Sequence, residues 1–160
     1  MLICYSFFLI FSVQAQTKDE TEKWIISKFD KWKKSKSSTQ LPNPYSRVPI
    51  SIKFNGCDLE IKSKYSTPES TEIQLYTIKI GDITSFTWDQ NDFYIMSRKR
   101  NVIVKSYPID DPSNAKMNYL GGCVISFETD AEENLTTRLT KAFENLKSFC
   151  PPTKDEKEAF

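Results

Sequence analysis

The chain has 160 residues, of which 13% are aromatic, and its 22 basic and 21 acidic residues leave a formal net charge of +1. A balance this close argues against a general binder of nucleic acids or anionic membranes, which would carry a clear basic excess. The chain contains no histidine, which excludes Ser-His-Asp and Cys-His catalytic pairs and His-ligated zinc or haem from within it. The composition therefore favours a non-catalytic protein that needs no cofactor.

Residues 1–15 (MLICYSFFLIFSVQA) carry no charge and end in Val13-Gln14-Ala15. A short apolar run followed by small residues two positions apart is the pattern that a signal peptidase recognises. The run is shorter than the about 20 apolar residues that cross a bilayer. We predict a signal peptide, a mature protein that begins at Gln16, and a location in the periplasm or outside the cell. Because no Lys or Arg precedes the run, a buried strand or helix is the alternative; lipidation of Cys4 is disfavoured, since a lipid-modified Cys would follow the run.

Residues 17–34 have the pattern of an amphipathic helix. Thr17 and Glu20 form a capping box, in which each side chain accepts a hydrogen bond from a free backbone N–H at the helix start. Ile25, Phe29 and Trp32 follow at the spacing of one helix face. We expect this stripe to pack against the rest of the protein, and a helix lying on a membrane surface is the alternative.

Residues 35–49 are rich in Ser and Pro and predict a connection, so residues 16–49 are expected to form a helix and a linker. From residue 50 onward, apolar residues alternate with polar ones, which is the period of a β-strand. Seven strands are predicted, at residues 50–54, 57–61, 72–80, 83–88, 93–97, 102–107 and 123–128. Their spacing is typical of an antiparallel meander.

Three local patterns refine this strand prediction. Asn55-Gly56 predicts a tight type I′ hairpin turn. The apolar phase slips between Leu75 and Tyr76, which predicts a bulge. Residues 108–118 are polar and contain two prolines, so we predict a loop there.

Residues 131–149 predict a second helix, with Asp130 and Glu133 as its capping box. Its apolar stripe consists of Leu135, Leu139, Ala142, Phe143 and Leu146. Pro151-Pro152 ends the helix, and residues 151–160 are expected to form a flexible tail. An apolar helix face that follows seven strands can cover the open end of a bent β-barrel.

This order of elements resembles the pleckstrin-homology-like superfold over residues 50–150. The resemblance implies an α+β protein with an N-terminal helix, a seven-stranded antiparallel barrel and a C-terminal capping helix. The lipid binding of many such domains is not expected here, because the turn Asn55-Gly56 carries no basic residue. The export segment ending at Ala15-Gln16 and the helix over residues 18–29 also resemble those of small exported proteins of Bacteroidota-type bacteria.

Three cysteines remain after the predicted cleavage, Cys57, Cys123 and Cys150, and none forms a CxxC pair. Free cysteines commonly pack as small hydrophobic residues, and these three lie in apolar patterns, so buried thiols are favoured. One disulfide among the three is the alternative in an oxidising compartment. The sequence does not decide its pairing.

Two groups of residues are candidate ligand or partner surfaces. The basic cluster Arg98-Lys99-Arg100 could bind an anion, although solvated charges on a hairpin turn also discourage edge-to-edge pairing. Trp24, Trp32 and Tyr94 could line a groove, although aromatic residues in such elements more often belong to a core.

The leading hypothesis is an exported, non-catalytic binding or scaffold domain that engages a protein or peptide. Its expected surface is the groove between the first helix and the barrel, or an exposed barrel edge that accepts a peptide strand. An envelope-associated protein with its first helix on lipid is one alternative. A hydrolase that uses carboxylates alone is another.

Overall fold

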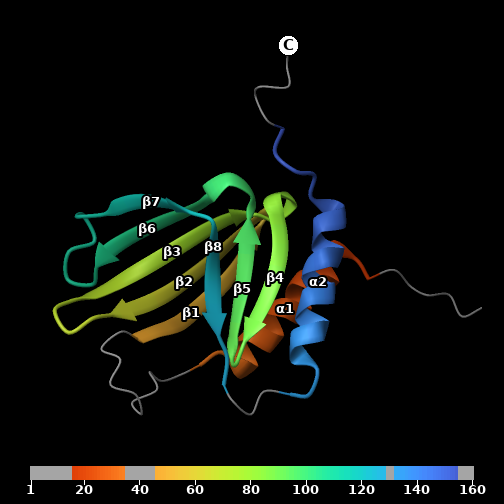
Figure 1. Cartoon of the computed structure of the whole chain (residues 1–160), viewed down its shortest axis with the longest axis horizontal. Coiled ribbons are helices and arrows are strands. Elements are labelled where there is room, and N and C mark those ends of the chain that lie inside the picture. The colour runs from red at the N-terminus through yellow and green to blue at the C-terminus, as the bar shows by residue number, and fades with distance from the viewer. Residues whose placement is uncertain (1–15, 35–45, 129–131, 155–160) are drawn as a thin grey trace, which may run out of the picture.

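The structure is a computed structural model, and it describes residues 16–34, 46–128 and 132–154. Two α-helices flank the β-strands, α1 (Lys18–Trp32) and α2 (Leu135–Phe149). The strands are β1 (Ser46–Asn55), β2 (Asp58–Ser66), β3 (Thr71–Lys79), β4 (Ile83–Asp89), β5 (Asp92–Ser97), β6 (Val102–Pro108), β7 (Lys116–Leu120) and β8 (Gly122–Ser126). Short 3₁₀ turns, η1 (Ile80–Asp82) and η2 (Arg98–Arg100), precede β4 and β6. The protein is α+β, with a helix before and a helix after the strands, as predicted (Figure 1).

The strands form two antiparallel sheets rather than one closed barrel. The large sheet has the order β1-β2-β3-β6-β7, and the small sheet has the order β4-β5-β8. Because β3 pairs with β6, the β4–β5 hairpin leaves the large sheet and the chain then returns to it. The predicted meander is therefore interrupted, and neither sheet closes on itself.

The described residues contain eight strands, not seven, and the additional one is β7. It lies mostly within residues 108–118, which the sequence predicted to be a loop. All five residues of β7 are exposed, so the strand lacks the alternation of buried and exposed positions that a sequence pattern detects.

The helix α2 covers the core between the sheets, as its apolar stripe predicted. Leu139, Phe143 and Leu146 are all at most 1% exposed. The ring of Phe143 lies 5.5 Å from that of Phe86 and 5.7 Å from that of Phe93. The stripe therefore packs on the small sheet through a cluster of aromatic rings.

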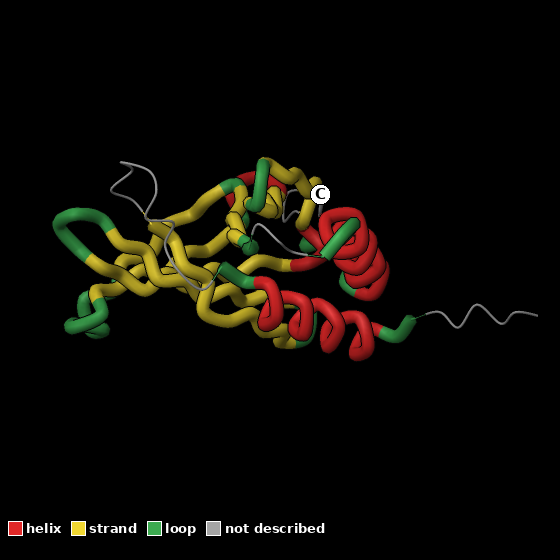
Figure 2. The backbone as a smooth tube through the Cα atoms, turned by 90° about the horizontal axis from the view of Figure 1, so that it is seen from below, coloured by secondary structure: helices red, strands yellow, loops and turns green. Residues whose placement is uncertain are grey.

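The helix α1 lies beside α2, and both helices sit at one end of the sheets (Figure 2). Its capping box is present: the Glu20 N–H donates to Thr17 Oγ1 at 3.3 Å, and the Thr17 N–H donates to Glu20 Oε2 at 2.9 Å. Ile25 and Phe29 are each 1% exposed. The apolar stripe of α1 is thus buried in the protein itself.

Polar contacts fasten α1 along the β1 edge of the large sheet. Lys18 Nζ donates to the Gly56 carbonyl at 2.6 Å, and Lys33 Nζ donates to the Ile50 carbonyl at 2.9 Å. Just beyond the helix, the Lys34 N–H donates to the Ser126 carbonyl at 3.0 Å, next to the end of β8. The helix therefore spans the opening between β1 and the small sheet.

The start of β1 corrects the predicted linker. The strand begins at Ser46 and passes through Pro49, inside the segment expected to be a connection over residues 35–49; residues 35–45 lie outside the described part. Proline is tolerated here because β1 is an edge strand and its pairing with β2 shifts between Pro49 and Ser51.

The tight turn between β1 and β2 consists of Gly56 and Cys57, because Asn55 pairs with Asp58. Only Gly56 has a positive φ there, at 62°, which fits a type II′ turn and not the predicted type I′. The predicted bulge between Leu75 and Tyr76 is also wrong, since the β2–β3 register runs through both without a shift.

The start of α2 differs from the prediction as well. The helix begins at Leu135, after Asn134 with φ 59°, and not at residue 131; Asp130 lies outside the described residues. Glu132 accepts from Lys28 Nζ at 2.8 Å and from Arg138 Nη1 at 2.7 Å. The left-handed conformation of Asn134 prevents the helix from extending further towards residue 131.

Candidate binding surfaces

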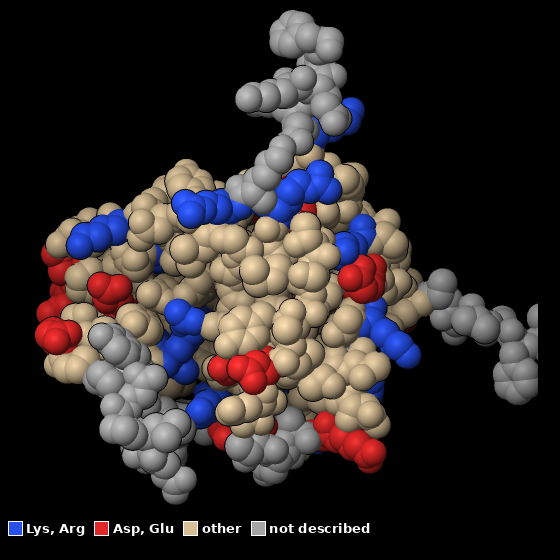
Figure 3. Space-filling view, viewed as in Figure 1, with Lys and Arg blue, Asp and Glu red and all other residues tan. Residues whose placement is uncertain are grey.

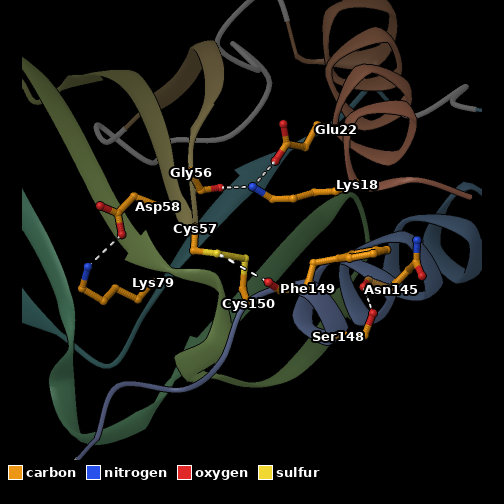
Figure 4. The surroundings of a disulfide bond; sticks show 10 residues. All are labelled: Lys18, Glu22, Gly56, Cys57, Asp58, Lys79, Asn145, Ser148, Phe149 and Cys150. Atoms are coloured by element: carbon orange, nitrogen blue, oxygen red, sulfur yellow. Dashed lines mark hydrogen bonds and ion pairs between the residues drawn. A yellow bond between two sulfur atoms is a disulfide. The ribbon is translucent and has the colours of Figure 1, made fainter.

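A disulfide bond joins Cys57, in the β1–β2 turn, to Cys150, at the end of α2 (Figure 4). Their Cα atoms lie 5.5 Å apart although 93 positions separate them in sequence. The favoured prediction of three buried thiols is therefore wrong for these two, while Cys123 is a free, buried thiol. Both partners lie in apolar patterns that gave no sign of the pairing, because only the packing of α2 brings them together.

The residues after Cys150 are also held in place. A Cβ atom on Gly81 would lie 2.3 Å from the Pro151 carbonyl oxygen, so only glycine permits this close approach. The Thr153 N–H and hydroxyl each donate to the Asp82 carboxylate at 2.8 Å. Residues 150–154 thus form a strap across the η1 turn, and residues 155–160 of the predicted flexible tail lie outside the described part.

Asp82 is a buried anchor for this strap, with only 1% of its surface exposed. Burial alone would raise the pKa of Asp82, but hydrogen bonds from Thr153 and Asn101 and the nearby charge of Arg98 outweigh it and hold the pKa below its ordinary value. The carboxylate is therefore ionised in the folded protein near neutral pH.

The strand β7 forms an exposed edge of the large sheet (Figure 1). Met117 is 62% exposed, Tyr119 61% and Leu120 43%. An edge strand has a neighbour on one side only, so backbone N–H and C=O groups on the other side of β7 lack sheet partners among the described residues. Three large apolar side chains therefore accompany an unpaired strand edge.

The outer face of the large sheet continues this apolar surface. Residues paired across antiparallel strands share a face, so Lys62, Leu75, Lys105 and Met117 form one row and Glu60, Thr77, Ile103 and Tyr119 form the next. Beside the second row lies a pocket of about 320 Å³, lined in part by Ile103, Tyr119 and Thr153. We call Ile103, Met117, Tyr119 and Lys105 the β7 surface.

Basic residues dominate the charge around the β7 surface. Lys62 and Lys64 on β2 and Lys105 on β6 share the outer face with one unpaired carboxylate, Glu60, and form no ion pair with any residue in the described ranges. Lys116 on β7 is in register with Ser106 and lies on the opposite face. The Lys79 ammonium is instead paired with the Asp58 carboxylate at 3.0 Å. The surface therefore joins apolar side chains to unpaired positive charges.

A second pocket, also of about 320 Å³, opens between the two sheets where β7 turns into β8. Its lining is predominantly apolar and consists of Arg47, Tyr76, Tyr94, Met96, Leu120, Gly121, Gly122, Cys123 and Val124. We call it the inter-sheet pocket. It exists because β7 and β8 belong to different sheets and do not pair with each other.

Arg47 is the single charged residue in the lining of the inter-sheet pocket. Its guanidinium carbon lies 5.6 Å from the ring centre of Tyr65 and 5.7 Å from that of Tyr76, which is cation–π distance. The Arg47 Nε atom is buried and has no hydrogen-bond acceptor among the described residues. A charged donor is therefore held in place without an ion-pair partner among the residues that the structure describes.

Two titratable groups in the lining beside Arg47, Tyr76 and Cys123, are neutral. Burial raises the pKa of Tyr76, and Arg47 opposes this only in part; the Tyr76 hydroxyl donates to Gln74 Oε1 at 2.5 Å. Burial likewise raises the pKa of the Cys123 thiol to about 12. Neither group supplies the negative charge that Arg47 lacks.

The structure distributes the predicted site residues over separate places. Trp24 lies in the α1–α2 groove, where the Arg138 guanidinium is 5.0 Å from its ring centre. Trp32 packs partly buried against the core, and the cluster Arg98-Lys99-Arg100 forms the η2 turn between the sheets. Tyr94 lines the inter-sheet pocket together with Arg47.

Sequence reasoning missed Arg47 and β7 altogether. Arg47 lies in the segment expected to be a linker, and β7 lies mostly in a predicted loop. The alternation of residues along β5 was a usable signal for Tyr94. Phe93 and Ile95 are 0% exposed and Met96 is 39% exposed. Tyr94 and Met96 therefore face away from the core.

Comparison with known proteins gave no match. No protein-family model, no curated protein and no solved structure is significantly similar to this chain. Over the described ranges, no group of three or more Cys, Asp or Glu side chains is placed to hold a metal ion. Neither described helix is long and apolar enough to span a membrane.

Proposed function

We propose that this protein is an exported, non-catalytic binding module, and that it binds an extended protein segment with acidic and apolar side chains along β7. The observation that carries the proposal is the β7 edge itself, with Met117 and Tyr119 each more than 60% exposed. An extended segment would add to the sheet as a further strand. Backbone hydrogen bonds would then give affinity, and alternate side chains would give specificity.

The exposed apolar residues support a partner because proteins usually protect a sheet edge. Short strands, charges, prolines and covering elements are the common protections. β7 is short and carries Lys116, yet Met117 and Tyr119 add apolar surface beside Ile103, which is 38% exposed. Contiguous exposed apolar surface of this kind marks interaction sites.

The charges support an acidic partner over a second copy of this chain. Lys62, Lys64 and Lys105 lie on the same face as the apolar residues and have no ion-pair partner among the described residues. A second copy paired along β7 would add the same excess of positive charge to this face and would not neutralise it. Asp and Glu side chains on an added strand would instead be attracted to them.

The disulfide supports the exported location. Disulfides form and persist in secreted and periplasmic proteins and are rare in the cytosol. The bond between Cys57 and Cys150 joins two structural elements of the fold, as a structural disulfide would. It agrees with the signal peptide predicted for residues 1–15, which lie outside the described part.

We also propose that the fold resembles the pleckstrin-homology-like superfold in its general architecture. It is supported by a C-terminal helix that covers the core between antiparallel sheets. The pairing of β3 with β6 weighs against a close relationship. An experimental structure of the oxidised chain would test it by the strand order.

The function is tested by selecting short random peptides from a displayed library on the oxidised chain. Selected peptides are expected to alternate acidic with apolar residues. Their affinity should fall about tenfold or more in the double variant Met117→Ser/Tyr119→Ser, since few residues carry most of the binding energy of an interface. The charge reversal Lys105→Glu should also weaken binding, and the matched reversal Lys141→Glu on α2 should not. Selection of no peptide, or of peptides that bind the double variant equally well, would overturn the proposal.

A further inference from the structure

We propose that the inter-sheet pocket binds a small amphipathic carboxylate, with its head group on Arg47 and its apolar body between β5, β8 and the end of β7. This site is separate from the strand-binding surface proposed above. Tyr119 and Met117 lie on the outer face of the large sheet, whereas Tyr76 and Leu120 lie on the inner face, which the pocket uses. The two proposals can therefore be tested and overturned independently.

The chemistry of Arg47 indicates which head group the ligand carries. Leaving a buried donor without an acceptor is unfavourable, and it is more so for a charged group. The Arg47 Nε–H is such a donor, and no described residue forms an ion pair with this guanidinium. A carboxylate accepts two parallel hydrogen bonds from a guanidinium, so it would satisfy this donor and the positive charge together.

The position of the guanidinium is fixed before any ligand arrives. The rings of Tyr65 and Tyr76 lie within 5.7 Å of it, and Tyr76 is itself 2% exposed and anchored to Gln74. A charged group held by packing loses little conformational freedom on binding. This arrangement differs from that of a mobile surface arginine.

The rest of the pocket lining indicates an apolar body for the ligand. Tyr94, Met96, Leu120 and Val124 present apolar atoms, and the Cys123 thiol is neutral because burial raises its pKa to about 12. The volume of about 320 Å³ lies at the small end of the range for ligand sites. The surface over β4, β5 and β8 is mostly uncharged (Figure 3), so a second charged group on the ligand would find no partner there. We therefore assign a single carboxylate on a short apolar chain or ring.

Octanoate is a suitable probe, with octanol and octylamine as matched compounds that keep the chain and change the head group. The readout is the set of backbone amide signals in an NMR titration of the oxidised chain. Gly121 and Gly122 line the pocket, and Gly56 lies in the β1–β2 turn outside it. Octanoate is expected to shift the signals of Gly121 and Gly122 saturably and to leave that of Gly56 in place.

Two variants make the test specific. Arg47→Gln should weaken octanoate binding at least about tenfold, because the charge-assisted pair is lost, while the matched variant Arg100→Gln on the exposed η2 turn should leave it unchanged. If Arg47→Gln does not fold, Val124→Trp replaces it in the test. This variant fills the pocket and leaves Arg47 intact, so it should also weaken octanoate binding. Octanol binding as well as octanoate, an unchanged affinity in the variant that folds, or no shift at millimolar octanoate would each overturn the proposal.

Discussion

The two edges of the large sheet are treated in opposite ways. At the β1 edge, α1 donates two lysine hydrogen bonds to β1 and its turn, and the Cys57–Cys150 disulfide fixes the same turn to α2. At the β7 edge, within the part of the chain that the structure describes, no helix, disulfide or strap covers the strand, and every residue of it is exposed. The fold thus protects one edge by covalent and polar contacts and leaves the other open.

The β7 edge is exposed although the fold has elements that could cover a sheet edge. The described part of the chain contains two helices and a C-terminal strap, and all of them pack at the β1 edge, the small sheet or the η1 turn. Among the described residues, no element pairs with the free edge of β7, which bears Met117 and Tyr119, and such an edge is where a partner strand can add. Stability and binding are therefore expected to depend on separate residues.

The largest expected effect is at the covered edge. The double variant Cys57→Ser/Cys150→Ser should lower the free energy of unfolding by about 4 kcal/mol, because the cross-link closes a long loop in the unfolded chain. Urea denaturation of oxidised wild type and variant measures this difference. Adding dithiothreitol should destabilise wild type to a similar extent and leave the variant unchanged.

Cys123→Ala is the matched control for this prediction. It removes a buried thiol without breaking a cross-link, so it should cost about 1 kcal/mol. A wild-type protein whose stability does not respond to the reductant would contradict the role given to the disulfide.

The second prediction concerns the strap that continues from the covered edge. The folded-state pKa of Asp82 is depressed, so its contribution to stability is present above its unfolded-state pKa and is lost as pH falls through the lower, folded-state pKa. At about pH 6, Asp82→Asn should lower the free energy of unfolding by about 1–2 kcal/mol. The gap between wild type and variant should narrow as pH falls below about 4, the ordinary pKa of an aspartate, because the depressed folded-state pKa lies lower still.

Urea denaturation across this pH range measures the gap for Asp82→Asn. The exposed Asp110→Asn is the control and should change stability little at any pH. A gap that stays constant with pH would show that the hydrogen-bond geometry of Asp82, and not its charge, holds Thr153.

The two amphipathic helices and the half-buried strands are the parts that the sequence predicted best. The α1 capping box at Thr17 and Glu20 and the α2 stripe around Phe143 depend on residues a few positions apart, so local periodicity reveals them. Phe93 and Ile95 likewise alternate as strand residues should. The pattern is readable in each case because one face of the element is buried and the other is not.

The open edge and the pocket could not be predicted in the same way, for physical reasons. β7 has no buried face, so its alternation carries no signal. Arg47 reaches the inter-sheet pocket only because β1 continues through Pro49, and the local composition around it favours a linker. The Cys57–Cys150 pairing depends on where α2 ends relative to the β1–β2 turn, which is a property of the whole fold.

The smallest expected effect on stability is at the open β7 edge. Met117→Ser/Tyr119→Ser should change the free energy of unfolding by no more than about 0.5 kcal/mol, because both side chains are mostly exposed already. Urea denaturation measures this, alongside the loss of peptide binding expected for the same variant. A double variant that loses both stability and binding would show that β7 supports the fold, and the separation of the two edges would then be wrong. A variant that keeps its stability and loses only its binding would show that Met117 and Tyr119 serve the partner alone.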